Sequence, residues 1–167
     1  AHDFGMQGAG TVSEVLVIGG QFRVPGQGSL VYGLVTWDGA EFGFLGPRFS
    51  GIVNALTSHW VDETIGSVLV AAIEVPAPAM PAGIVYWDGT AWVELGTNSP
   101  THCFGFTHFD HDDDAETPDR LVAAGHGGVY IHAESGVWEL IPGLTLATSV
   151  TSFDEDGAGP LPPTLYA

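Results

Sequence analysis

The chain has 167 residues, of which 20 are acidic and three are basic, and its formal net charge at pH 7 is −17. Nucleic-acid binding needs Lys and Arg to neutralise phosphates, so this charge balance excludes nucleic acid as a partner and disfavours an anionic membrane surface. The longest apolar run, residues 68–73, is far shorter than the ~20 residues of a membrane helix, so we expect no membrane insertion.

Short runs rich in β-branched and aromatic residues follow one another along the whole chain, each bounded by Gly, Pro or Asp, which is typical of strands. In chain order, the predicted strands are 16–20, 34–37, 41–45, 52–60, 69–72, 83–87, 91–95, 102–109, 121–125, 128–131, 137–140, 146–153 and 165–167. No stretch of ten or more residues has helical apolar spacing without a Gly or Pro inside it. The sequence therefore predicts an all-β protein.

The word Trp-Asp-Gly occurs at residues 37–39 and again 50 residues later, at 87–89. An aromatic residue (Phe42, Trp92) and a Leu-Gly pair (45–46, 95–96) follow each copy, and a looser third copy ends at 136–140. Four short strands per ~50 residues predict β-propeller blades. We expect a single domain, 1–167, with repeats at approximately 16–68, 69–120 and 121–164. A sandwich with the same strands would not explain the repetition.

The repeated residues suggest architectural roles. Gly accepts the positive φ of a tight hairpin, so Asp-Gly predicts the turn between the second and third strands of each repeat. The repeated aromatic residues are interpreted as packing between blades, with ligand stacking as the alternative.

Three four-stranded antiparallel blades plus an extra strand form a partial or open propeller, because propellers close with 4–8 blades. Residues 1–15 look like the tail of a preceding strand. Unclosed blades leave apolar faces and strand edges exposed. We therefore expect further blades from the same or another chain to complete the array.

Residues 33–39, the aromatic and Leu-Gly that follow, and residues 152–167 resemble the Trp-Asp-Gly repeats of large secreted bacterial proteins, which are similar to kelch-type propellers. The resemblance covers essentially the whole chain and implies a propeller fold, but its motifs carry no reaction. The third copy departs from the pattern, because His132-Ala133-Glu134-Ser135-Gly136 replaces Trp-Asp-Gly.

Residues 108–119 form the densest polar cluster, and Asp110, Asp112, Asp114 and Asp119 resemble the calcium loops of integrin-type propeller repeats. Carboxylates two residues apart in a tight loop can converge on a hard cation that takes 6–8 oxygen ligands. Ala115 stands where such loops carry a turn-forming Gly. Two interpretations remain open, a calcium site and a solvated turn, and no other cofactor is predicted.

His102, Cys103, His108 and His111 are ligand types that zinc prefers. Strict strand alternation places Cys103 on the opposite face from His102 and His108, which argues against a shared metal. His59 and His108 each precede an aromatic residue at the end of a strand, so we interpret them as repeat-equivalent structural residues. Cys103, the single cysteine, is expected in mid-strand as an inert small hydrophobe. No catalytic residue is predicted.

The composition and the repeats favour a non-enzymatic scaffold, adhesion or binding module, with protein or carbohydrate as partner. An acidic surface suits an extracellular or cell-surface location. Two alternatives remain open. One is a propeller glycoside hydrolase or lyase acting on polysaccharide, because paired carboxylates are spatial and not visible in sequence. The other is an accessory subunit of a larger assembly.

Overall fold

The computed structural model describes residues 15–23, 30–46, 51–74, 83–100, 102–110, 119–154 and 163–167. Within these ranges every regular element is a strand, which confirms the all-β prediction. No helix among the described residues is long and apolar enough to cross a membrane.

The strands lie close to their predicted positions. Their bounds are β1 Leu16–Arg23, β2 Leu30–Trp37, β3 Phe42–Gly43, β4 Val53–Trp60, β5 Ser67–Ile73, β6 Gly83–Trp87, β7 Trp92–Glu94, β8 Cys103–Phe109, β9 Arg120–Gly125, β10 Gly128–His132, β11 Trp138–Ile141, β12 Thr151–Phe153 and β13 Thr164–Tyr166. The strand predicted over 146–153 is much shorter, because Leu146 forms an isolated bridge to His126 instead.

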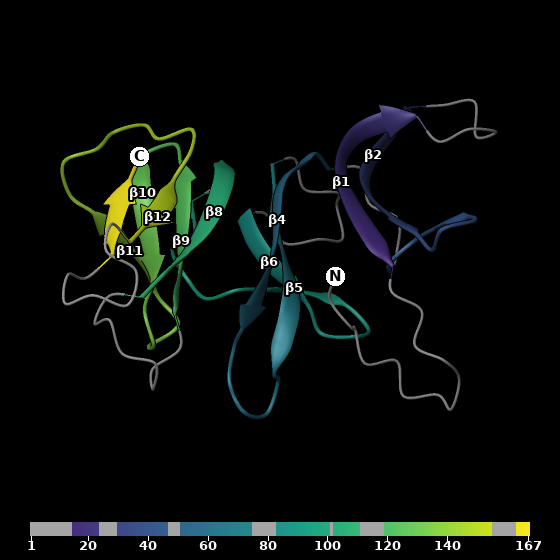
Figure 1. Cartoon of the computed structure of the whole chain (residues 1–167), viewed down its shortest axis with the longest axis horizontal. Helices are drawn as coiled ribbons and strands as arrows, with labels where there is room; N and C mark the ends of the chain where they lie inside the picture. Colours follow the sequence, from purple (N-terminus) through teal and green to yellow (C-terminus); the bar gives the residue numbers. More distant parts are fainter. Residues whose placement is uncertain are drawn as a thin grey trace.

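The strands form four antiparallel sheets, in each of which neighbours in sequence are neighbours in space. The first sheet is β1-β2-β3, the second β4-β5-β6-β7, the third β8-β9-β10-β11 and the fourth β12-β13. Figure 1 shows the first sheet on one side, the second in the centre and the third and fourth together on the other side.

Sheets and sequence repeats are offset by one strand. The second sheet begins with β4, which closes the repeat 16–68, and continues with three strands of the repeat 69–120. The third sheet likewise takes β8 from the repeat 69–120. Because the second and third sheets each include a strand from the preceding repeat, consecutive repeats are joined by strand pairing as well as by packing.

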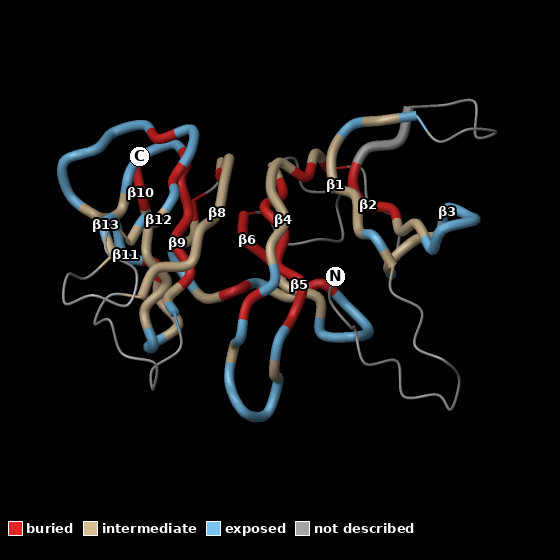
Figure 2. Tube along the Cα trace, in the orientation of Figure 1, coloured by how far each residue is buried: buried red, intermediate tan, exposed pale blue. Residues whose placement is uncertain are grey.

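Consecutive sheets pack face to face, with β1 against β4, β4 against β8 and β8 against β12. We call the face of each sheet that is turned toward the preceding sheet its front face, and the other its back face. Along β5, Leu69 lies in the apolar cluster with the first sheet, whereas Val68 and Val70 lie in the cluster with the third. The middle strands β5 and β9 are therefore buried on both sides (Figure 2), which explains why their sequences are continuous apolar runs.

Candidate functional site

The Asp and Gly of the repeated word build a hairpin loop. Oδ1 of Asp38 accepts hydrogen bonds from the backbone N–H groups of Ala40 and Glu41, each at 2.8 Å, and Asp88 makes the same pair in the second sheet. These bonds hold the pKa of both carboxyl groups below the ordinary Asp value. Gly39 and Gly89 have φ near 100°, as predicted, in a loop of four residues.

The aromatic residues of the word pair across neighbouring strands in all three larger sheets. Ring centroids are 4.7 Å apart for Trp37 and Phe42, and 5.5 Å apart for Trp87 and Trp92. The third sheet keeps the arrangement with a histidine in place of the first tryptophan, since the rings of His132 and Trp138 lie 5.0 Å apart. Trp87 and Trp92 pack in the cluster between the first and second sheets, so the predicted packing role is confirmed there.

The Leu-Gly pair explains how closely the sheets approach. A Cβ on Gly46 would lie 2.5 Å from the ring of Trp87 in the next sheet, and one on Gly96 would lie 2.9 Å from Nε2 of His132. A glycine of one sheet thus lies against the ring that ends the second repeat strand of the following sheet. In the second sheet the repeated residues therefore form the hairpin loop and pack against the neighbouring sheets, whereas Phe42 of the first sheet is 40% exposed.

Three histidines meet between the second and third sheets. The ring centroid of His59 is 5.6 Å from that of His108 and 6.0 Å from that of His132. His59 is 8% exposed, and burial together with the two neighbouring imidazoles lowers its pKa to about 4. Burial also lowers the pKa of His108, which Asp119 and a hydrogen bond to the Ser58 backbone partly counteract, and that of His132. His59 Nδ1 and His132 Nε2 are buried without a hydrogen-bond partner.

The predicted equivalence of His59 and His108 is wrong. Strand register places His59 opposite Val68 and His108 opposite Leu121. His108 therefore corresponds to Ser58, which lies opposite Leu69, and His59 corresponds to Phe109. The two histidines are therefore one residue apart in the repeat register. His59 lies on the back face of the second sheet and His108 on the front face of the third, so they meet in the interface between these two sheets.

Strict alternation along β8 is also wrong, because a register shift between Cys103 and Gly105 reverses the order of faces. Cys103 and Phe106 consequently lie in the same apolar cluster between the second and third sheets. Cys103 begins the strand rather than lying in its middle. Burial raises the pKa of its thiol to about 12, which is the inert state that we expected.

Only some of the residues in the metal predictions lie in the part of the chain that the structure describes. Asp112, Asp114 and His111 lie outside them, so calcium binding by Asp110, Asp112, Asp114 and Asp119 stays a prediction. His102 and His108 are at opposite ends of β8. Among the residues that the structure describes, no three His, Cys, Asp or Glu side chains form a group that could hold a metal ion.

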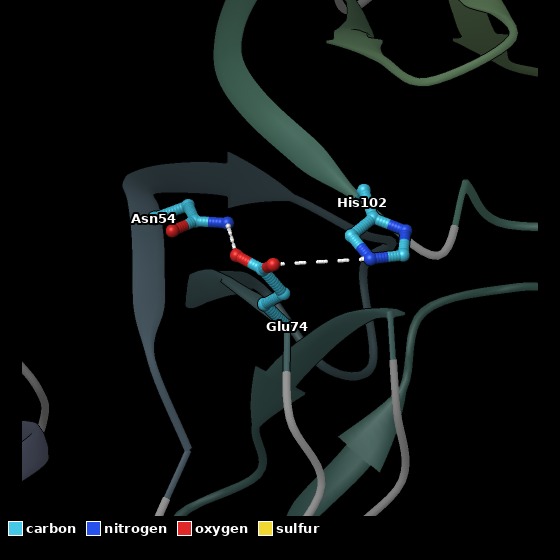
Figure 3. Close-up of polar contacts among 3 residues, drawn as sticks. All are labelled: Asn54, Glu74 and His102. Atoms are coloured by element: carbon cyan, nitrogen blue, oxygen red, sulfur yellow. Dashed lines mark hydrogen bonds and ion pairs between the residues drawn. The ribbon is translucent and has the colours of Figure 1, made fainter.

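A polar cluster that sequence analysis did not single out lies where β4 and β8 begin and β5 ends (Figure 3). Glu74 accepts a hydrogen bond from Nδ2 of Asn54 at 3.0 Å, and its other carboxylate oxygen lies 3.8 Å from Nε2 of His102. The side chains of Glu74 and His102 are about a third exposed, at 32% and 40%. The carboxylate is thus fixed by one sheet and faces a side chain from the next.

Aromatic rings extend this cluster over the third sheet. The ring of His126 stacks on that of His102 at 4.8 Å, and the ring of Phe104 meets His126 edge-on at 5.3 Å. His126 belongs to the two-residue turn between β9 and β10, and its backbone N–H donates to the carbonyl of His102. We call Asn54, Glu74, His102, Phe104 and His126 the rim cluster.

The rim cluster combines a fixed carboxylate, an amide, imidazoles and an apolar ring at a partly exposed edge. Such a set can accept and donate hydrogen bonds to hydroxyl groups while rings cover apolar C–H surfaces. Its five residues come from different strands and strand ends, and they span 72 positions of the sequence, from Asn54 to His126.

No protein-family model, no curated protein and no solved structure matches the chain.

Proposed function

We propose that the chain is a segment of a β-propeller that acts as a non-enzymatic scaffold or binding module outside the cell or at its surface, and that the rim cluster is its ligand contact. The observation that carries this proposal is the separation of roles. Most of the repeated residues form turns or pack between sheets, whereas the polar rim cluster lies at the junction of the second and third sheets and is partly open to solvent.

The order of the sheets supports the propeller part of the proposal. Each larger sheet is a meander, and the strand that ends one sheet leads to the strand that begins the next. Contacts between sheets concentrate on the first strands, β4, β8 and β12. Blades arranged around an axis approach one another most closely at their inner strands, which gives this pattern.

The chemistry of the rim cluster favours a neutral glycan as ligand. A formal charge of −17 repels acidic polymers, which argues against an anionic polysaccharide. Hydroxyl groups match the Glu74 carboxylate and the Asn54 amide, and the face of a sugar ring matches Phe104 and His126. An exposed peptide segment is the competing ligand and would be recognised by the same donors and acceptors.

A neutral-glycan panel with calorimetric titration of each hit tests the proposal. Glu74→Ala and Phe104→Ala should each weaken binding at least tenfold, because each removes a main contact of the cluster. Thr90→Ala, in the exposed loop after β6, is the control and should bind like the wild type. If the glycans that bind the wild type also bind Glu74→Ala and Phe104→Ala with unchanged affinity, the rim cluster is excluded as the glycan-binding site.

The same panel separates the enzyme and assembly alternatives. Release of reducing ends or unsaturated products that Glu74→Gln abolishes would establish a hydrolase or lyase and reject the non-enzymatic proposal. Absence of binding to any glycan, with capture of a partner protein that Glu74→Ala weakens, would favour an accessory subunit.

A further inference from the structure

The rim cluster contains the same backbone irregularity in two consecutive sheets. The pairing of β4 with β5 shifts register at Asn54, and the pairing of β8 with β9 shifts register at Phe104. Both shifts come directly after the first residue of the strand, so Asn54 and Phe104 are bulged residues at equivalent positions. A β-bulge leaves the extra residue out of the ladder and re-aims its side chain, and bulges are frequent beside binding sites.

A second residue completes this arrangement in each sheet. Glu74 and His126 directly follow β5 and β9, and the backbone N–H of each donates to the carbonyl of the residue that precedes the first strand of its sheet, at 3.0 and 2.9 Å. Nδ2 of Asn54 donates to the Glu74 carboxylate at 3.0 Å. The ring of Phe104 meets that of His126 edge-on at 5.3 Å. We call the first pair the second-sheet corner and the other the third-sheet corner.

The two corners are neighbours on the rim. Figure 3 shows the Glu74 carboxylate between Asn54 and His102, with Nε2 of His102 at 3.8 Å. The ring of His102 also stacks on that of His126, at a centroid distance of 4.8 Å. His102 therefore connects the two corners, and a ligand that extends along the rim from one corner reaches the other.

We propose that each corner is one subsite for a linear neutral oligosaccharide, which runs along the rim with different sugar units on the two corners. This inference rests on the proposed function and specifies the form of its ligand. Because the corners recur with the repeat, a ligand that also repeats meets each corner with a further unit, whereas a single terminal sugar contacts only one. Packed sheets are about 10 Å apart, which is about the length of a disaccharide.

The two subsites differ in chemistry. The second-sheet corner presents an amide and a carboxylate, which donate to and accept from sugar hydroxyl groups. The third-sheet corner presents Phe104 and His126, whose rings cover the apolar face of a sugar. A chain of linked sugars offers hydroxyl groups and ring faces together, so one oligosaccharide satisfies both corners.

The first sheet carries a further hydrogen-bonding residue at the same position. Register aligns Gln21 of β1 with Glu74 and His126, since each comes directly after the residue that pairs with an equivalent glycine of the neighbouring strand. This part of β1 lies against the start of β4, because a Cβ on Gly19 would lie 2.5 Å from Val53. Gln21 is exposed, and it is the next contact for a longer oligosaccharide.

Titration of the full chain with oligosaccharides of increasing length tests the inference. The probes are linear β-1,4-linked oligomers of glucose, mannose and xylose, each from one to six units, measured by calorimetry and, for weak binding, by ligand-observed NMR. For the series that binds, affinity should rise at least about tenfold from one unit to four, because the second corner binds a unit that is already tethered to the first.

Variants show where this gain arises. Glu74→Ala and Phe104→Ala should each abolish the gain with length, because each leaves a single corner. Gln21→Ala should weaken binding of the six-unit oligomer and leave that of the four-unit oligomer unchanged. Thr90→Ala is the control and should keep the wild-type dependence on length. Circular dichroism of each variant checks that it is folded.

The outcomes separate this inference from the proposed function. Equal affinity for one unit and for four, with both weakened by Glu74→Ala, would overturn the row of subsites and leave the rim cluster as a site for a single sugar. A gain with length that neither corner variant reduces would also overturn the inference. Absence of binding by all three series would overturn it as well, and a peptide ligand that Phe104→Ala weakens would then be the occupant of the rim cluster.

Discussion

The interface between the first and second sheets and the interface between the second and third sheets share one plan and differ in chemistry. Between the first and second sheets, the glycine of a Leu-Gly pair faces the indole of Trp87, and between the second and third sheets the next such glycine faces the imidazole of His132. Ser58 lies in the interface between the first and second sheets. The equivalent residue in the interface between the second and third sheets is His108, whose ring lies beside that of His59. The repeat therefore preserves a small residue opposite a flat ring, while the ring itself changes from the indole of Trp87 to the titratable imidazole of His132.

Replacing the glycine of the second interface should give the largest effect. Gly96→Ala places a Cβ against the carbonyl of Gly136 and the ring of His132, at a φ of +74°. Backbone strain and overpacking add, so we expect a loss of about 3 kcal/mol in the free energy of unfolding, measured by urea titration.

Gly89→Ala is the matched control, because it has a similar positive φ of +100° and no atom within 4 Å of a built Cβ. It should lose only the strain component, about 1 kcal/mol. Equal losses in the two variants would show that contact between the sheets does not restrict Gly96.

The histidine interface should make stability depend on pH. The pKa of His59 is lowered to about 4 in the folded chain, so the unfolded chain binds more protons below the ordinary value of about 6.5. Stability should therefore fall as pH falls from 6.5 toward 4, by about 2 kcal/mol at pH 5 from this residue alone. His59→Leu should remove that share of the decline in urea titrations at pH 7.5 and pH 5.

Phe109→Leu provides the comparison, since Phe109 is the equivalent of His59 in the next interface and does not titrate. Its pH profile should run parallel to that of the wild type. If His59→Leu also leaves the profile parallel, the proton uptake resides elsewhere.

The hydrogen bond of Trp138 should contribute less. Nε1 of Trp138 donates to the carbonyl of Leu95 across the second interface at 2.6 Å. Trp138→Phe keeps an aromatic ring but leaves this buried carbonyl without its donor, so we expect a loss of about 1.5 kcal/mol with an unchanged denaturant slope. A loss below about 0.5 kcal/mol would mean that another donor replaces the indole.

The smallest effect should come from the loop of the repeated word. Asp88→Ala removes an exposed carboxylate that accepts two backbone N–H groups, so the melting temperature at pH 7 should decrease slightly. Because the pKa of Asp88 is lowered in the folded chain, this contribution should vanish as pH falls through that lowered value. Ser135→Ala, in the corresponding loop of the third sheet, should leave the melting temperature unchanged at both pH values.

Much of the fold could be predicted because local chemistry and repetition agree. Apolar runs such as 69–72 predict strands that are buried on both faces, and Asp-Gly predicts the loops between strands. Two features escaped prediction. The register shift near Cys103 was not predicted, and it reverses the face of Cys103 relative to the residues from Gly105 to Phe109. The offset of His59 and His108 is likewise set by register, which adjacent residues alone do not reveal.

The candidate site was less predictable than the fold. Asn54 and Glu74 were not singled out in the sequence, and His102 was considered only as a zinc ligand. Only the packing of the second sheet on the third brings the three side chains together. The polar run 108–119 was predicted as a candidate calcium site because its carboxylates lie close together in the sequence. A site assembled from strand ends in different repeats has no such local signal.

Proton NMR of the folded chain tests whether Gly46 and Gly96 each lie against the ring of the following sheet. We expect nuclear Overhauser contacts from the Gly46 α-protons to the indole of Trp87 and from those of Gly96 to the imidazole of His132, with α-proton shifts displaced by the ring currents. Glycine α-protons at random-coil shifts, with no contact to either ring in a chain that is otherwise folded, would contradict it.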